Sequence, residues 1–331
     1  MRGAARGRIT VKTVFLTGAE GFTGTLLTHA LRSRGYDVVG GVRNRARKLA
    51  FEKQHGKAVV CDVSDAINVA RAVASVRPDG LIHLAGLSQP HVAANEPLDA
   101  YQSIVTAWAN VLDAVRRVAP RAKVLLASAC DVYGDAGQDG RALPEDTPLL
   151  PVTTFGSLKA AAEAIGQTYF RNYHTNITIV RPFHYTGARQ GESTFFASVA
   201  RRLAEWDTQA NGTTLELPDL DCRRDLSHVG DVVQAYIALL ESGQPNTTYN
   251  VCSGQPHTVR EIVEQLIRAS GLGLTLSEQR TDHPAPIRNL CGDNQRIRSH
   301  TDWKPEASLQ KTVNDLLGGF RSQPAPAGQV A

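Results

Sequence analysis

The stretch PVTTFGSLKAAAEA, residues 151–164, places Phe155 and Lys159 four residues apart, on one face of a predicted helix. A hydroxyl and an amine at this spacing would form a proton-transfer pair. Lys159 supplies the amine, but Phe155 has no proton to give. The stretch therefore raises the question of whether the chemistry is lost or carried by other residues.

The segment TGAEGFTG places three glycines between an apolar, strand-like run and an amphipathic, helix-like run. Glycines are needed there because the chain turns sharply and a pyrophosphate must approach backbone N–H groups at the helix N-terminus. This order of strand, glycines and helix predicts a dinucleotide site. Its predicted residues are Gly18, Gly21, Phe22, Gly24, Arg43, Asp62, Val63, Leu84, Ala85, Gly86 and Lys159.

The ends of the next two strands bear on which dinucleotide binds. About 20 residues past the glycines an acidic residue would hold the ribose of NAD, but this chain has GVRNRARK. Arg43 and Arg45 either meet the 2′-phosphate of NADP or belong to a solvated turn. Asp62, in CDVSD, either accepts a hydrogen bond from the adenine amino group or merely neighbours a helix N-cap.

A parallel sheet would position these residues at one edge. Strand-like DVVGGV, AVVCDV, GLIHLAG and AKVLLASA alternate with helix-like DAINVARAVASV and LDAYQSIVTAWANVLDAVRRV. Apolar strands joined by helices indicate an α/β fold with a doubly wound parallel (Rossmann) sheet. We predict this domain over residues 13–181, a flexible extension at 1–12, a smaller α+β substrate-binding region over 182–320 with some segments returning to the sheet, and a tail at 321–331.

Composition excludes several other classes of function. The 331 residues carry a net charge of +4 from dispersed basic residues, which does not imply nucleic acid. The five cysteines are far apart and contain no CxxC, so neither a disulfide framework nor a metal site is expected. No long apolar segment follows the basic N-terminus, so we expect a cytoplasmic protein with no membrane partner.

Several motifs together resemble those of the extended short-chain dehydrogenase/reductases that act on nucleotide sugars. They are the glycine segment, Asp62, HLAG, SACDVYG, Lys159, RPFHYTG, RRDLSHVGDVV, YNVCSG and GDNQRIRSHTDWKPE. The likeness is strongest to the epimerase/dehydratase branch, especially its GDP-mannose-type dehydratases and 4-keto-sugar reductases. It implies a nicotinamide dinucleotide and a sugar-nucleotide substrate.

The same resemblance implies a catalytic Tyr four residues before the Lys, assisted by a Ser or Thr on the preceding strand end. Here Phe155 takes the Tyr position and Ala129 the Ser/Thr position. Three explanations compete: a substitution that traps substrate, a non-catalytic sugar-nucleotide-binding protein, or acid–base work moved to other residues. We favour the last, because the cofactor and substrate motifs are otherwise intact.

Cys130 and Asp131 take the positions where dehydratases of this family carry an acid and a base. There the acid protonates the departing C6 hydroxyl and the base removes the C5 proton. A carboxylate is a sufficient base once C4 is a ketone, and a thiol with a pKa of about 8.5 stays protonated at neutral pH. The non-catalytic alternatives are that Cys130 is a buried structural cysteine and that Asp131 only forms a turn.

A cysteine as the acid resembles the exo-glycal-forming 5,6-dehydratases of tunicamycin-type antibiotic pathways, which act on UDP-N-acetylglucosamine. Their hydride returns to C4, so a resident NAD suffices. We predict this activity with NAD, keeping NADP as the alternative that Arg43 indicates. A 4-keto-6-deoxysugar reductase, a 4,6-dehydratase and an epimerase are the alternatives within the family. Lys159, Asp131 and a bound water remain open as the base at C4.

The resemblance also names substrate contacts. Arg224, in RRDLSHV, is the expected pyrophosphate ligand, since a guanidinium binds paired phosphate oxygens. His184 stands where relatives carry Asn, and Ser88 is placed to touch the hexose. His283 stands where relatives often have a phosphate-binding Arg, or is an ordinary loop residue. Family likeness further predicts a homodimer formed through helices at 98–118 and 155–174.

Overall fold

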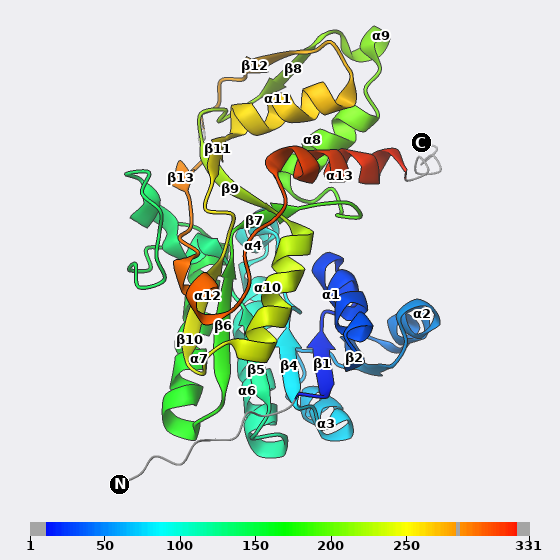
Figure 1. Cartoon of the computed structure of the whole chain (residues 1–331), viewed down its shortest axis with the longest axis vertical. Helices are drawn as coiled ribbons and strands as arrows, with labels where there is room; N and C mark the ends of the chain where they lie inside the picture. The colour runs from blue at the N-terminus through cyan, green and yellow to red at the C-terminus, as the bar shows by residue number, and fades with distance from the viewer. Residues whose placement is uncertain (1–10, 283–284, 323–331) are drawn as a thin grey trace.

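The computed structural model describes residues 11–282 and 285–322 (Figure 1). Seven parallel strands form the central sheet in the order β10-β6-β5-β4-β1-β2-β3. Their bounds are β1 Thr13–Thr17, β2 Asp37–Val42, β3 Ala58–Val60, β4 Gly80–His83, β5 Lys123–Ala127, β6 Ile177–Pro182 and β10 Thr247–Val251. The predicted Rossmann-type sheet is confirmed, and β10 reaches its edge from a distant part of the chain.

Helices cover both faces of this sheet. One face packs against α1 (Phe22–Ser33), α2 (Arg45–His55) and α10 (Val229–Ser242), and the other against α3 (Ala66–Val76), α6 (Ala107–Val118) and α7 (Thr154–Tyr173). The interior strands are buried throughout, as in Val14, Leu16, Leu81 and Leu125, because both faces are covered. The helix α2 was not expected from GVRNRARK.

Three short elements precede α6, and a fourth follows β5. They are α4 (Pro90–Asn95), α5 (Pro97–Tyr101), the π-helix η1 (Gln102–Thr106) and the 3-10 helix η2 (Cys130–Gly137). The expected long helix at 98–118 is therefore one continuous run through α5, η1 and α6. Within η2, Gly134 adopts a left-handed φ of 49°, and a Cβ there would collide with the Leu150 carbonyl oxygen.

A second lobe lies beyond the carboxyl ends of the central strands, at the top of Figure 1. It contains α8, α9, α11, α13, the parallel pair β8–β12, and strand β9, which pairs with β7, β11 and β13. The bounds are β7 His184–Thr186, α8 Phe195–Ala204, α9 Thr208–Asn211, β8 Thr214–Leu217, β9 Arg223–His228, β11 Pro256–Thr258, α11 Val259–Ser270, β12 Thr275–Glu278, β13 Asn289–Leu290 and α13 Leu309–Arg321. The helix α12 (Gln295–His300) instead packs against β10 of the central sheet.

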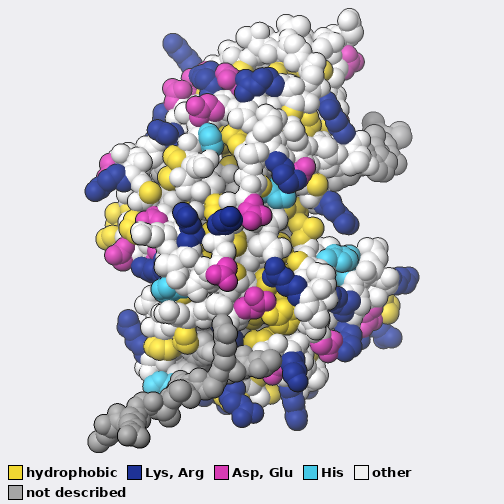
Figure 2. Space-filling model, in the orientation of Figure 1, with side chains coloured by type: hydrophobic (Ala, Val, Ile, Leu, Met, Phe, Trp, Pro, Cys, Tyr) yellow, Lys and Arg dark blue, Asp and Glu magenta, His cyan; other side chains and the backbone are white. Residues whose placement is uncertain are grey.

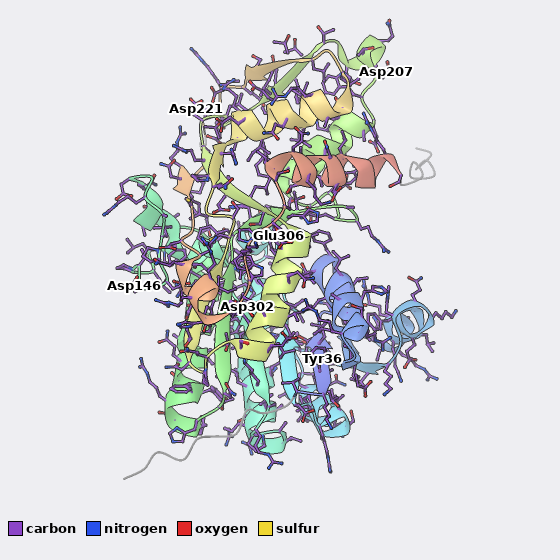
Figure 3. All side chains as sticks on the ribbon, in the orientation of Figure 1. Tyr36, Asp146, Asp207, Asp221, Asp302 and Glu306 are labelled. Carbon is purple, nitrogen blue, oxygen red and sulfur yellow. The ribbon has the colours of Figure 1, made fainter. Side chains whose placement is uncertain are left out.

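Surface features agree with the composition. Figure 2 shows Lys and Arg side chains scattered among acidic ones on the visible face, with no single basic stripe. Tyr36, labelled in Figure 3, donates its hydroxyl to Glu241 at 2.9 Å and so ties the turn before β2 to α10. No helix among the described residues is long and apolar enough to cross a membrane. The predicted 1–12 extension and 321–331 tail fall mostly outside the described residues.

Candidate active site

The glycine segment forms a cradle with no room for side chains. Gly18 has a φ of 71°, and a Cβ there would lie 2.7 Å from the Ala85 backbone nitrogen. Gly21 is the N-cap of α1, and a Cβ on Gly24 would collide with the Gly18 carbonyl oxygen. Glycine is therefore required at Gly18 and Gly24, and the glycines place no side chains at the N-terminus of α1, as close approach of a pyrophosphate requires. The predicted dinucleotide site fits these residues.

The HLAG loop lies beside this cradle. The Leu84 N–H donates to the Thr17 carbonyl at 3.2 Å, and the Ala85 N–H donates to the Thr17 hydroxyl at 3.4 Å. Gly86 has a φ of 136°, and a Cβ there would lie 2.8 Å from the Ser103 carbonyl oxygen. The ends of β1 and β4 thus present main-chain groups at one edge of the sheet.

One oxygen of the Asp62 carboxylate accepts hydrogen bonds within its own turn. Its Oδ1 accepts from the Ser64 N–H at 3.1 Å and from the Ser64 hydroxyl at 2.7 Å. The N-cap of α3 is Asp65, so Asp62 is not itself the cap. Oδ2 of Asp62 has no hydrogen bond within the described parts of the chain and is free to accept one. The neighbouring Val63 carbonyl accepts from Asn110 at 3.0 Å.

The arginines after β2 lie in different structures. Arg43 is exposed and makes no hydrogen bond or ion pair to another described residue. Arg45 is the first residue of α2, whose N-cap Asn44 accepts from the Arg47 N–H. The exposed Arg43 side chain therefore stands at the carboxyl end of β2, and the solvated turn is only two residues long.

Phe22 joins the cofactor cradle to the second lobe. Its ring stacks on Tyr185 of β7, with centroids 6.3 Å apart and planes at 11°. The Tyr185 hydroxyl is 3.0 Å from the Thr23 hydroxyl. These contacts fix the start of α1 beneath β7, so β7 stands close to the predicted cofactor site.

Cys130 and Asp131 begin η2, directly beyond β5. The Cys130 thiol points at Asp131, with Sγ 3.9 Å from Oδ2. Burial, reinforced by the Asp131 carboxylate, raises the pKa of the Cys130 thiol well above its usual value. Burial also raises the pKa of Asp131, against the opposing effects of its own N–H, Arg224, Cys130 and Lys159. The thiol remains a proton donor beside a carboxylate that binds protons more readily than usual.

Phe155 and Lys159 lie on the first turns of α7, as predicted. Phe155 is buried, and the Lys159 Nζ lies 5.6 Å from the centre of its ring. Nζ donates to the Ala127 carbonyl at 2.8 Å. Burial lowers the pKa of Lys159 to about 8, while the charges of Glu163 and Asp131 act in the opposite direction. The amine thus titrates near neutral pH, with a hydrocarbon ring where relatives carry a hydroxyl.

Neither missing hydroxyl is replaced by a neighbour. Ala129 is buried among apolar side chains. The Ser128 hydroxyl turns the other way and donates to Glu163 at 2.5 Å. The backbone of α7 also packs directly on the pair, because a Cβ on Gly156 would lie 2.5 Å from the Asp131 carbonyl oxygen. The helix start and the Cys130–Asp131 turn are therefore in contact.

Two predicted substrate residues face this pair. Arg224 of β9 acts electrostatically on Cys130, Asp131 and His184, which places all four together. Its guanidinium donates to the carbonyls of Arg223, Arg288 and Ile287 at 2.9, 3.1 and 2.8 Å.

His184 of β7 carries a buried Nδ1 without a hydrogen-bond partner in the described chain. Burial and the Arg224 charge lower its pKa to about 3, so the imidazole is neutral. This nitrogen is therefore a buried polar atom that the described chain leaves unsatisfied. Ser88 lies exposed in the loop between β4 and α4, with no contact that ties it to the pair, and His283 lies outside the described residues.

A buried polar cluster beneath the site was missed by the sequence reasoning. Glu163 and Arg181 form a bidentate ion pair, with N–O distances of 2.9 and 2.7 Å. Arg181 also donates to the Tyr133 hydroxyl at 2.8 Å. The only signal for Glu163 was its position four residues after Lys159 on the same helix face. Nothing in the sequence pairs it with Arg181, since that needs the packing of α7 on β6.

Comparison with known proteins agrees with this geometry. The family described as GDP-mannose 4,6 dehydratase matches residues 15–316, nearly the whole chain. The chain belongs to this family. Within it, the GDP-6-deoxy-D-mannose reductase of Pseudomonas aeruginosa is 30% identical over 247 residues, covering 74% of this chain and 81% of that protein.

Two solved structures superpose on nearly the whole of this family member. RMD from Pseudomonas aeruginosa, complexed with NADPH, gives a TM-score of 0.81 at 27% identity and covers 94% of this chain and 98% of its own. The UDP-glucose 4-epimerase of Thermus thermophilus, complexed with NAD, also gives 0.81, at 25% identity, with coverages of 94% and 99%. Reductases, dehydratases and epimerases thus share this fold, so the reaction must be argued from the site.

Proposed function

We propose that this protein is a nucleotide-sugar 5,6-dehydratase, with UDP-N-acetylglucosamine as the first substrate to test. The observation that carries the proposal is the part-buried Cys130–Asp131 contact of 3.9 Å at the start of η2, beyond β5. A protonated thiol beside a carboxylate supplies the acid and the base of a water elimination. The absence of hydroxyls at 129 and 155 argues against chemistry that follows the usual family pattern.

The first step needs a base at C4, and Lys159 suits it. Its Nζ lies beside the Phe155 ring, where relatives carry the proton acceptor, and its pKa of about 8 leaves a useful fraction neutral near pH 7.5. Asp131 is adjacent to Cys130, so we assign it instead as the base that removes the C5 proton. Lys159 accepts the C4 hydroxyl proton as the C4 hydrogen leaves as hydride, and it returns that proton at the end.

Elimination uses the pair in sequence. Asp131 takes the C5 proton, which the C4 ketone has made acidic, and Cys130 gives its proton to the departing C6 hydroxyl, so that water leaves. This leaves a protonated carboxyl 3.9 Å from a thiolate. Transfer of the proton from Asp131 to Cys130 across this contact restores both groups. The sugar has then lost one water with no net change in oxidation state.

The cofactor we propose is NAD, held at the cradle of Gly18, Gly21 and Gly24, with Asp62 on the adenine side and Lys159 on the nicotinamide ribose. When bound, it supplies a hydride acceptor at C4 and returns the hydride there. The exposed Arg43 is the feature that keeps NADP as the alternative. NADPH and NAD in the two similar structures support a nicotinamide dinucleotide for this chain without choosing between them.

The substrate would lie between the two lobes, with residues 182–320 contributing most of its contacts. We propose Arg224 as the ligand of the pyrophosphate and the neutral His184 as a contact of the substrate. Ser88 would approach the hexose from the β4 side. We also propose a homodimer through the α5–η1–α6 run and α7, where Leu98 and Tyr101 are 79% and 50% exposed.

The test is incubation with UDP-N-acetylglucosamine and, in parallel, GDP-mannose, followed by mass spectrometry. We expect loss of one water from one of them without net consumption of cofactor. Stoichiometric NADPH consumption on a 4-keto-6-deoxysugar would instead establish a reductase, as in the Pseudomonas relative. Tight binding without product from any sugar nucleotide would establish a non-catalytic binding protein.

A further inference from the structure

The Glu163–Arg181 ion pair is the centre of a fully buried cluster, which we call the hub: Ser128, Tyr133, Glu163 and Arg181. All four side chains are at most 4% exposed. Glu163 accepts from Ser128 at 2.5 Å and from Arg181 at 2.9 and 2.7 Å. Arg181 donates to the Tyr133 hydroxyl at 2.8 Å and lies over its ring at 4.9 Å.

The hub touches each segment that carries a reacting group. Ser128 lies two residues before Cys130, Tyr133 lies two residues after Asp131, and Glu163 lies one helical turn after Lys159. Arg181, at the end of β6, bonds to the η2 and α7 members at once. The Arg181 guanidinium and the Glu163 carboxylate together join these three segments, because Glu163 also accepts from Ser128. This fixes the distance between the thiol–carboxylate pair and the lysine.

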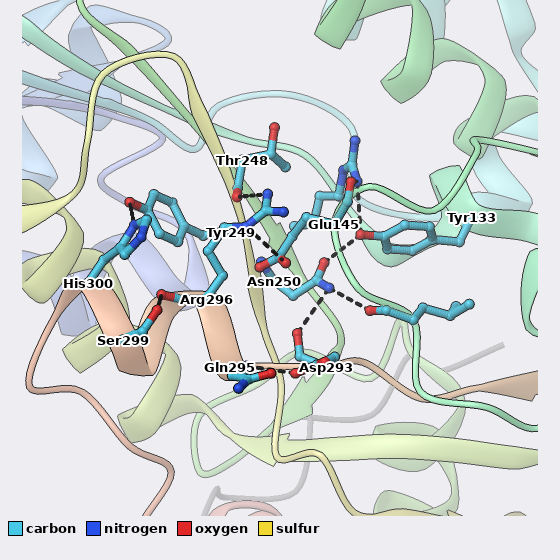
Figure 4. A network of polar contacts seen from close by, with 12 residues as sticks. Tyr133, Glu145, Thr248, Tyr249, Asn250, Asp293, Gln295, Arg296, Ser299 and His300 are labelled. Atoms are coloured by element: carbon cyan, nitrogen blue, oxygen red, sulfur yellow. Dashed lines mark hydrogen bonds and ion pairs between the residues drawn. The ribbon is translucent and has the colours of Figure 1, made fainter.

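A second ion pair anchors the hub from the far side. Tyr133 donates to Asn250 of β10 at 2.7 Å, and the Asn250 N–H donates to Glu145 at 2.9 Å. Arg296 of α12 pairs with Glu145 at 3.4 Å (Figure 4). The Glu145 backbone carbonyl, which a side-chain substitution leaves in place, also accepts from Arg181 at 3.1 Å. This outer pair resembles the inner one in chemistry, but it contacts none of the segments bearing Cys130, Asp131 or Lys159.

Stability alone is a weak reason for such an arrangement. Desolvation of a buried ion pair offsets most of its attraction, and well-packed apolar replacements are often neutral. Complete hydrogen bonding instead selects one relative position for the groups that share it. A buried charge also acts on nearby titrating groups with little screening.

The titratable groups that face Lys159 come from three elements. Glu163 lies on its own helix and Asp131 on η2, and both are carboxylates that act on Lys159, whereas His83 at the end of β4 is neutral. Of these, Glu163 has the larger effect of the two carboxylates, and it holds the pKa of Lys159 up against burial. Removing the Glu163 charge would therefore let that pKa fall further below about 8.

We propose that Glu163 and Arg181 are positioning residues for the reaction: they hold the Cys130–Asp131 turn against the Lys159 helix, and the Glu163 carboxylate, one helical turn from Lys159, stabilises the protonated amine. The kinetic part of this inference rests on the proposed function. The titration part does not, because Lys159 also belongs to the cofactor site.

The experiment compares Glu163→Leu/Arg181→Met with the matched outer pair Glu145→Leu/Arg296→Met. NAD affinity is measured from pH 6 to 10 by quenching of tryptophan fluorescence, with Lys159→Gln identifying the titration of Lys159. The midpoint in the wild type is expected near 8, the pKa of the amine. We expect the inner double variant to move the midpoint to lower pH, because the Glu163 charge is lost and Arg181 is not among the charges that act on Lys159. The outer variant should leave the midpoint in place.

Kinetics test the positioning separately. In the inner variant kcat should fall by about 10² with KM little changed, because a displacement near 1 Å costs that much. Tyr133→Phe removes one hydroxyl from the hub and should lower kcat without moving the Lys159 midpoint. If the inner variant folds and changes neither kcat nor the midpoint, the inference is wrong.

Two further outcomes are distinguishable. If the inner variant does not fold, Glu163→Gln and Tyr133→Phe carry the same two measurements, and an unchanged midpoint in the former overturns the electrostatic part. If the wild type turns over no sugar nucleotide, the proposed function fails. The NAD titration still decides whether Glu163 controls Lys159.

Discussion

Asp131 and Cys130 have separable tasks in the proposed elimination, and isotope exchange can tell them apart. In D₂O, Cys130→Ala should still exchange the C5 hydrogen of the substrate, because Asp131 remains as base. Loss of the acid should lower the rate of water loss by about 10²–10⁴. Asp131→Asn should abolish both exchange and elimination. Mass spectrometry of recovered substrate measures the exchange, and C5 exchange in Asp131→Asn would contradict the assignment.

At the scale of residues, the sequence could predict which side chains are unusual but not which way they face. Cys130, Asp131, Phe155 and Lys159 were all found by position in motifs. Ser128 shows what was out of reach, since its hydroxyl is next to the missing one and turns instead to Glu163. That choice depends on a buried carboxylate supplied by another element.

The contact between α7 and η2 gives a prediction at the scale of elements. Gly156→Ala would place a Cβ 2.5 Å from the Asp131 carbonyl oxygen, a backbone atom that cannot move without shifting the catalytic turn. We expect kcat to fall at least tenfold, and the free energy of unfolding to fall by about 1–3 kcal/mol from overpacking. Enzyme kinetics and urea unfolding measure the two effects.

The matched control is Gly166→Ala, on the same helix. Its Cβ would meet only side-chain atoms, the nearest at 3.5 Å, which is ordinary contact. Helix propensity should then make this variant neutral or more stable by up to about 1 kcal/mol. If both variants behaved alike, the close approach of α7 to Asp131 would not be the cause.

The elements themselves were largely predictable, since apolar runs of strand length alternate with amphipathic runs. Short elements such as α4, β7 and α12 were not predicted, and the longest element missed is α2. Arg45, Arg47 and Lys48 give that segment no apolar face that marks it as a helix. Only Phe51 of α2 is buried, beneath a chain that is otherwise solvated. A helix with one buried residue, held otherwise by polar contacts such as Arg47 to Glu20 and His55 to His29, leaves little periodic signal in the sequence.

At the scale of the whole molecule, the order of segments along the chain does not predict which distant segments are in contact. The sequence predicted the sheet and the cofactor edge, but the hub joins residues 128, 133, 163 and 181 with a strand near 250. Such pairings follow from the path of the chain across the sheet. They could not be read from spacing, although each member lies within a few residues of a predicted site.

His83 makes the free energy of unfolding of the whole fold depend on pH. It is 1% exposed, its Nδ1 lies 2.7 Å from the Thr17 hydroxyl, and its Nε2 has no partner among described residues. Burial, with a smaller effect of the Lys159 charge, lowers its pKa to about 3. In the unfolded chain the pKa is about 6.5. The unfolded state therefore binds a proton between these values that the folded state does not.

The sign follows directly: the contribution of His83 is complete above pH 6.5 and is lost as the pH falls toward 3. The free energy of unfolding should drop by up to about 1.4 kcal/mol per pH unit in that range because of this one group. His83→Asn keeps a polar partner for Thr17 but does not titrate, so urea unfolding from pH 7 to 4 should show a shallower decline than in the wild type. His91→Asn, at an exposed position on α4, is the control and should leave the slope unchanged. Equal slopes in all three proteins would show that the buried imidazole is not what makes the fold sensitive to acid.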